Sequence, residues 1–132
     1  LTDTEVITYI IDFLIRKKGL TLEETASVIA APFWTTIEEK DKEKAELLTY
    51  LRKTFPSLLI TGPFSIILGF NGGLMALNDR LKLRSMVVGE KVDFVYVASE
   101  ECAIRKMEPN LEKIWTPKGG DPVVVRLNKE IR

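Results

Sequence analysis

The sequence predicts an α+β fold in which helices come first and an antiparallel sheet follows. Up to Pro56, apolar residues recur at helical spacing and two capping boxes open helices. After Pro56, short β-prone runs are bounded by Gly, Asn, Asp and Pro, which is typical of strands joined by tight turns. The 132 residues contain no repeat and no dividing linker, so we expect one unit, helical over 2–55 and sheet over 57–128, or part of a larger layered domain.

The first helix is expected from about Asp3 to Lys18. Thr2 and Glu5 have the spacing of a capping box, in which each side chain satisfies a backbone N–H at the helix start. Asp3 is not needed for that cap, so its carboxylate is free to stabilise the helix dipole or to hold a cation such as a ligand's ammonium group. The side chains expected to face the core are Val6, Ile10, Phe13 and Leu14.

Two further helices follow. Thr21 and Glu24 form a second capping box, which predicts a helix through about Ala30. The densely charged stretch 38–46 mixes both signs and is interpreted as the solvated face of a third helix. The buried side of that helix is expected to carry Leu48, Leu51 and Phe55.

The second half of the chain reads as strands and turns. Asn71-Gly72-Gly73 lies between two apolar runs and predicts a hairpin, because Asn and Gly tolerate positive φ. The first hairpin is expected to pair Phe64 to Phe70 with Leu74 to Leu77. A second pair, Met86 to Val88 and Phe94 to Ala98, is expected around a turn at Gly89-Glu90-Lys91. A last strand, Val123 to Leu127, is expected after the Gly119–Pro122 turn. Leu111 to Trp115 is ambiguous between a strand and an irregular connection.

Composition excludes several classes of function. Lys plus Arg equals Asp plus Glu, so nucleic acid or an anionic membrane surface is not expected as the main partner. There is no histidine, which removes Ser-His-Asp and Cys-His catalysis and the usual zinc sites. An α-amino group is one general base that a chain can supply without histidine. We expect a cytoplasmic protein without metal or cofactor; one cysteine fits a reducing compartment.

Taken singly, the polar motifs identify no activity. Cys102, the single thiol, has glutamate neighbours that disfavour the thiolate, so we expect a buried structural cysteine. Asp79 is expected to form an ion pair with a nearby arginine or to cap backbone groups. Glu100 and Glu101 diverge on adjacent positions, and we expect them to cap a helix over 102–106.

Taken in order, five motifs resemble the second half of class II glutamine amidotransferase domains, the glutaminases with an N-terminal cysteine nucleophile. The motifs are Thr2-Asp3-Thr4-Glu5-Val6, Gly62-Pro63-Phe64-Ser65, Leu77-Asn78-Asp79-Arg80 through Leu83-Arg84, Ala98-Ser99-Glu100 with Ala103, and Gly119-Gly120-Asp121-Pro122-Val123. The resemblance covers essentially the whole chain. The turn at 77–84 and the approach at 115–120 are most similar to the amidotransferase portion of archaeal-type glutamate synthases. Phosphoribosylpyrophosphate amidotransferases and asparagine synthetases usually have glycine where Lys82 stands and proline where Ser85 stands.

The resemblance implies a stacked α/β/β/α sandwich that hydrolyses the side-chain amide of glutamine through a thioester and releases ammonia to a synthase. The family's nucleophile is the first residue of the mature chain, and its own α-amino group is the base. By the same resemblance, Asp3 would hold the α-ammonium group of glutamine. A buried, charge-assisted contact of that kind contributes on the order of 1.5–3 kcal/mol.

In that family the cysteine, the arginine for the substrate carboxylate and the Asn-Gly oxyanion donors all precede the aspartate. We therefore expect the chain to lack glutaminase activity alone and to need the N-terminal half of the domain and a synthase subunit or domain as partners. A half-domain with an open strand edge also predicts a possible homo-oligomer. The alternative is a non-catalytic assembly or regulatory module in which Asp3 only caps its helix.

Overall fold

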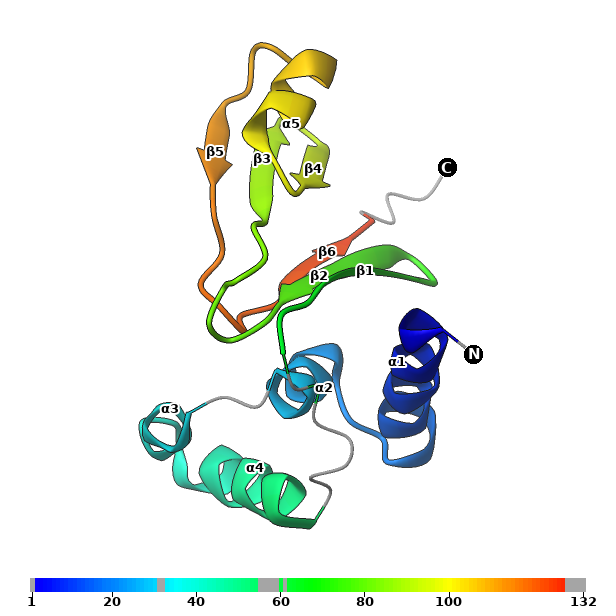
Figure 1. Cartoon of the computed structure of the whole chain (residues 1–132), viewed down its shortest axis with the longest axis vertical. Helices are drawn as coiled ribbons and strands as arrows, with labels where there is room; N and C mark the ends of the chain where they lie inside the picture. Colours follow the sequence, from blue (N-terminus) through cyan, green and yellow to red (C-terminus); the bar gives the residue numbers. More distant parts are fainter. Residues whose placement is uncertain (1, 31–32, 55–59, 61, 128–132) are drawn as a thin grey trace. The chain divides into compact units, whose positions relative to one another are not determined.

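The computed structural model describes residues 2–30, 33–54, 60 and 62–127, and the chain divides into two compact units, 1–62 and 63–132 (Figure 1). The boundary falls where helical periodicity gives way to β-prone runs. Within the described residues the first unit is helical and the second contains all the strands. That both units belong to one domain stays a prediction.

The first helix, α1 (Asp3–Asp12), begins at Thr2, whose hydroxyl accepts the N–H of Glu5 at 3.3 Å. A π-helical turn, η1 (Phe13–Lys17), continues α1, so the expected extent to about residue 18 is confirmed. The expected buried stripe is partly wrong. Leu14 is buried as expected, but the other core residue is Ile11, and Val6 and Phe13 are exposed. Residues 6–15 are apolar on nearly every side of the helix, so periodicity alone did not define the inward face.

Helix α2 (Leu22–Ile29) confirms the second capping box. The Thr21 hydroxyl accepts the N–H of Glu24 at 3.1 Å, and the Glu24 carboxylate accepts the N–H of Thr21 at 2.8 Å. The single charged helical face expected over 38–46 is wrong, because that stretch spans the end of α3 (Trp34–Glu38), a turn and the start of α4 (Lys42–Thr54).

The core of the helical unit forms where α2 contacts α4 and the π-helical turn, and where α3 contacts α4. Leu48 and Leu51 face inward from α4 as expected, whereas Phe55 lies outside the described residues. The buried apolar residues of this unit are Ile11, Leu14, Ala26, Val28, Ile29, Ala30, Ile37, Leu48 and Leu51.

The first sheet of the second unit has the order β1-β2-β6, with β1 (Ser65–Phe70), β2 (Gly73–Asn78) and β6 (Val123–Arg126) all antiparallel. The hairpin predicted around Asn71 and Gly72 is confirmed. Gly72 has φ +87°, the left-handed conformation that favours glycine in such a turn.

The second sheet has the order β4-β3-β5, with β3 (Val87–Lys91), β4 (Phe94–Ala98) and β5 (Lys113–Trp115). The expected turn at residues 89–91 is wrong, because these residues continue β3 and the chain reverses at Val92 and Asp93. Gly89 therefore serves packing: a Cβ there would lie 2.8 Å from a side-chain carbon of Ile104.

Helix α5 (Glu101–Met107) contacts β3 and β4 and brings Ile104 against Gly89. The two sheets share an apolar cluster to which each contributes. Its residues are Ala76, Met86, Val88 and Val123, with Val95, Val97, Trp115 and Val125 packed against them. The α+β class, helices first and antiparallel sheets afterwards, is confirmed.

Candidate functional site

Asp3 occupies the first position of α1, and its side chain is exposed. The Thr2 hydroxyl caps the helix, so the carboxylate of Asp3 does not take part in the cap. Within the described part of the chain, Asp3 makes no side-chain hydrogen bond or ion pair. An unengaged carboxylate beside the N–H groups of a helix start can accept a cationic group from a ligand.

A second polar centre is Asp79, which is 4% exposed and directly follows β2. Its Oδ1 accepts the backbone N–H groups of Leu81 and Leu83, each at 3.1 Å, and its Oδ2 accepts that of Arg84 at 3.2 Å. Burial by itself raises the pKa of the Asp79 carboxyl, but these donors and the N–H of Phe64 outweigh burial and hold the pKa below its ordinary value. The backbone-capping role expected for Asp79 is confirmed.

Three of the motifs that carry the resemblance meet at this turn. The N–H of Asp79 donates to the carbonyl of Phe64 at 3.0 Å, and the N–H of Gly120 donates to the carbonyl of Asn78 at 3.3 Å. A Cβ on Gly119 would lie 2.3 Å from the carbonyl oxygen of Arg80, so only glycine permits that approach. Phe64, residues 78–84 and Gly119–Gly120, far apart in sequence, therefore form one structural corner.

Lys82 lies inside this corner with φ +55°. Its N–H donates to the carbonyl of Asp79 at 2.9 Å, which closes the turn. A non-glycine residue in the left-handed region costs roughly 1–2 kcal/mol. Phosphoribosylpyrophosphate amidotransferases and asparagine synthetases usually have glycine where this chain has Lys82. The backbone conformation at Lys82 is one that favours glycine.

Asn78 completes the corner as a fully buried polar side chain. Its Nδ2 donates to the carbonyl of Arg84 at 3.4 Å, while its Oδ1 has no hydrogen-bond partner among the residues described. The sequence indicated no role for this amide, since nothing in the pattern distinguishes it from a turn residue.

Cys102 is exposed, so the expectation of a buried cysteine is wrong. Its Sγ lies 3.2 Å from a carboxylate oxygen of Glu100, to which it donates. That hydrogen bond raises the pKa of the Cys102 thiol, which disfavours the nucleophilic thiolate. The expected helix is present, but Glu100 at its N-cap makes no capping bond and Glu101 pairs with Arg105 instead.

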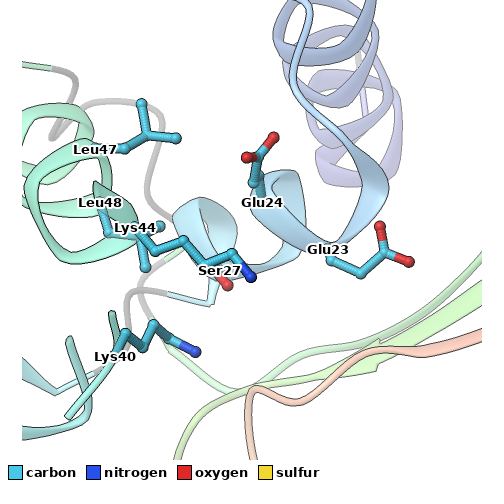
Figure 2. Close-up of a pocket in the computed structure, with 7 residues that line it drawn as sticks. All are labelled: Glu23, Glu24, Ser27, Lys40, Lys44, Leu47 and Leu48. Carbon is cyan, nitrogen blue, oxygen red and sulfur yellow. The ribbon is translucent and has the colours of Figure 1, made fainter. Parts of the chain in front are cut away.

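A small pocket of about 90 Å³ lies in the helical unit between α2 and the α3–α4 region (Figure 2). Ligand sites usually enclose about 300–1,000 Å³, so this pocket is too small for a cofactor. The carboxylate of Glu24, which lines the pocket, accepts the backbone N–H of Thr21. The Nζ of Lys44 lies 4.0 Å from the Oδ2 of Asp41. Its full lining is Glu23, Glu24, Ser27, Lys40, Lys44, Leu47 and Leu48.

Acidic and thiol side chains do not gather into a metal site anywhere in the described ranges, where no group of three or more could hold an ion. Over the same residues, no helix has the length and apolarity needed to cross a bilayer.

Comparison with known proteins adds one relative. An uncharacterized protein of Archaeoglobus fulgidus is 43% identical over 127 residues, which cover 96% of this chain and 34% of the relative. The chain thus spans about a third of the length of that relative. No protein-family model matches the chain, and no solved structure matches it.

Proposed function

We propose that the chain is part of a class II glutamine amidotransferase domain, which hydrolyses glutamine to glutamate and delivers ammonia to a synthase. The motifs at 77–84 and 115–120 are most similar to those of glutamate synthase. Its own contribution to the substrate site is Asp3, which would hold the α-ammonium group of glutamine. The nucleophile, the arginine for the substrate carboxylate and the oxyanion donors would lie on residues outside this sequence. The greater length of the archaeal relative leaves room for them.

The conformation of Lys82 carries the proposal. The resemblance rests on short motifs, and three of them join in one hydrogen-bonded corner. Inside that corner, Lys82 has a positive φ, at the position where phosphoribosylpyrophosphate amidotransferases and asparagine synthetases usually have glycine. A chance similarity of letters gives no reason for the backbone geometry here and the residue preference of those two groups to agree.

The chemistry of the chain is compatible with an N-terminal nucleophile. It contains no histidine, so hydrolysis would require another base, and an α-amino group is such a base. Cys102 does not substitute as the nucleophile, because Glu100 raises the pKa of its thiol and no cationic group is hydrogen-bonded to it in the described structure.

Calorimetric titration with glutamine tests the proposal, using the protein at its natural length with any co-purifying segment. We expect Asp3→Asn to weaken glutamine binding about tenfold to hundredfold, because it removes one charge-assisted contact. Glu5→Gln is the matched control, since it neutralises an acidic residue in the same helical turn and leaves the Thr2 cap in place.

Glutamine binding that is unchanged in Asp3→Asn would contradict the role of Asp3 and favour the assembly or regulatory module. Equal losses in Asp3→Asn and Glu5→Gln would assign the effect to the helix terminus in general. Intact mass and N-terminal sequencing of the natural protein complete the test, because the proposal requires a segment that begins with cysteine.

A further inference from the structure

The turn that joins β1 to β2 consists of Asn71 and Gly72, a pair to which the proposed function gives no chemical role (Figure 1). Asparagine is one of the thermolabile residues of proteins. When glycine follows it, the backbone nitrogen of the glycine can attack the asparagine side chain, because no Cβ hinders the approach. In a folded chain this reaction depends on exposure, hydrogen bonding and free space at the two residues.

The structure leaves both reacting groups of this turn open. Asn71 is exposed and Gly72 is partly exposed. Within the part of the chain that the structure describes, the Asn71 side-chain amide and the Gly72 N–H have no hydrogen-bond partner. A Cβ built on Gly72 would meet no atom within 4 Å beyond the adjacent residues. Neither group has to give up a protein hydrogen bond in order to react, and the turn has room for a ring to close.

The other asparagines in the described ranges lack this combination. Asn78 is fully buried, and the N–H of the residue that follows it donates to the carbonyl of Phe64. Asn110 is exposed, but it is followed by Leu111, whose side chain hinders an approach of the backbone nitrogen. Exposure, an open N–H and a following glycine therefore coincide at Asn71.

We propose that Asn71 is a self-modification site, at which the side chain deamidates through a cyclic imide. Hydroxide removes the proton of the Gly72 N–H, and the nitrogen forms a bond to Cγ of Asn71. The bond from Cγ to Nδ2 breaks, and Nδ2 takes a proton from water and leaves as ammonia, so that a five-membered succinimide remains. Water then opens the ring. Cleavage at Cγ leaves aspartate, and cleavage at the main-chain carbonyl leaves isoaspartate.

The isoaspartate product changes the hairpin, because it adds one methylene carbon to the main chain of a two-residue turn. That turn holds Phe70 opposite Gly73, and the carbonyl of Gly72 accepts the N–H of Leu127 at 2.8 Å. A Cβ on Gly73 would overlap the carbonyl oxygen of Val125, so the backbone beside the turn is closely packed. We expect the longer turn to destabilise the first sheet. Both products also add one negative charge to a chain whose formal net charge is zero.

Peptide mapping by mass spectrometry, after incubation of the protein at its natural length in mildly alkaline buffer, tests the site. We expect the peptide that carries Asn71 to gain about 1 Da, because ammonia is exchanged for water, and to become a substrate for isoaspartyl methyltransferase. The gain should become faster as the pH rises, since the Gly72 nitrogen must lose its proton. The peptide that carries Asn110 is the control in the same sample and should gain mass several-fold more slowly.

Two variants separate the reaction from general ageing. Gly72→Asp retains a residue that tolerates the left-handed conformation but adds a side chain beside the attacking nitrogen, so it should slow the mass gain about tenfold. Asn71→Ser cannot form the succinimide, and its urea midpoint should stay constant during incubation while that of the native protein falls. An Asn71 peptide that stays unmodified, while a synthetic peptide of residues 68–75 deamidates in the same buffer, would refute the site. So would equal rates at Asn71 and Asn110.

Discussion

The Asp79 carboxylate illustrates how one side chain can organise distant segments. It accepts several backbone N–H groups in a buried corner, so it replaces the hydration that those groups lose on folding. Its lowered pKa has the same origin, because the donors stabilise the charged form more than burial destabilises it.

We expect Asp79→Asn to lower the free energy of unfolding at pH 7 by about 1.5–3 kcal/mol, since hydrogen bonds to a charged group are lost. Urea denaturation measures this change. Asp121→Asn, at an exposed position, is the control and should leave stability nearly unchanged.

The same carboxylate predicts a pH dependence with a defined sign. The pKa of Asp79 is lower in the folded state than its ordinary value, so the unfolded state binds more protons and stability rises with pH in this range. The contribution is fully present above a pH of about 4, the ordinary value, and is lost as pH falls through the folded pKa. The stability difference between the native protein and Asp79→Asn should therefore shrink in acid, and a difference that grows in acid would contradict the assignment.

Cys102 gives a second prediction for a single residue. The Glu100 carboxylate raises the pKa of the thiol, so the thiolate fraction at neutral pH is small. Glu100→Gln removes that acceptor charge, and we expect the alkylation rate of Cys102 by iodoacetamide to increase several-fold. Glu101→Gln, whose carboxylate pairs with Arg105, is the control and should change the rate less.

Among the local elements, the turn at 79–84 combines a strained backbone with a strong anchor. Lys82 holds φ +55° because the N–H groups around it are bound to Asp79. Val92, at the β3–β4 reversal, is a second such residue with φ +46°, and its N–H donates to Glu112 at 3.1 Å. Both turns adopt shapes that their sequences do not favour.

Lys82→Gly should relieve this strain. We expect the free energy of unfolding to rise by about 0.5–1 kcal/mol, because the relief of left-handed strain exceeds the extra entropy of glycine in the unfolded chain. Thermal or urea unfolding measures it. Lys82→Ala, which removes the charge but keeps the strain, should show no comparable gain, and an equal gain in Lys82→Ala would attribute the effect to the charge.

Secondary structure could be predicted best where local chemistry decided it. The Thr21 capping box and the Asn71-Gly72 hairpin are confirmed because each depends on residues a few positions apart. The inward face of α1, the end of β3 and the exposure of Cys102 were predicted wrongly. In each case the local sequence was compatible with more than one structure, and packing against another element determined which one formed.

At the scale of the whole molecule, the chain forms two compact units and is much shorter than its archaeal relative. The chain matches about a third of that relative, so a glutaminase site shared with residues outside the sequence is compatible with it. Asp3 belongs to the helical unit and the Asp79 corner to the other. The titration of Asp3→Asn and the unfolding of Asp79→Asn therefore test separate parts of the molecule.

By itself, the sequence determined the α+β class, the starts of α1 and α2, the first hairpin and the free carboxylate of Asp3, because these depend on propensity, capping and turn chemistry within a few residues. Only the tertiary structure decided that Phe64, residues 78–84 and Gly119–Gly120 share one corner, that Asp79 is its hydrogen-bond centre and that Lys82 carries the strain. The physical reason is that burial and long-range hydrogen bonds join residues that are far apart along the chain, and the local sequence around them does not indicate that contact.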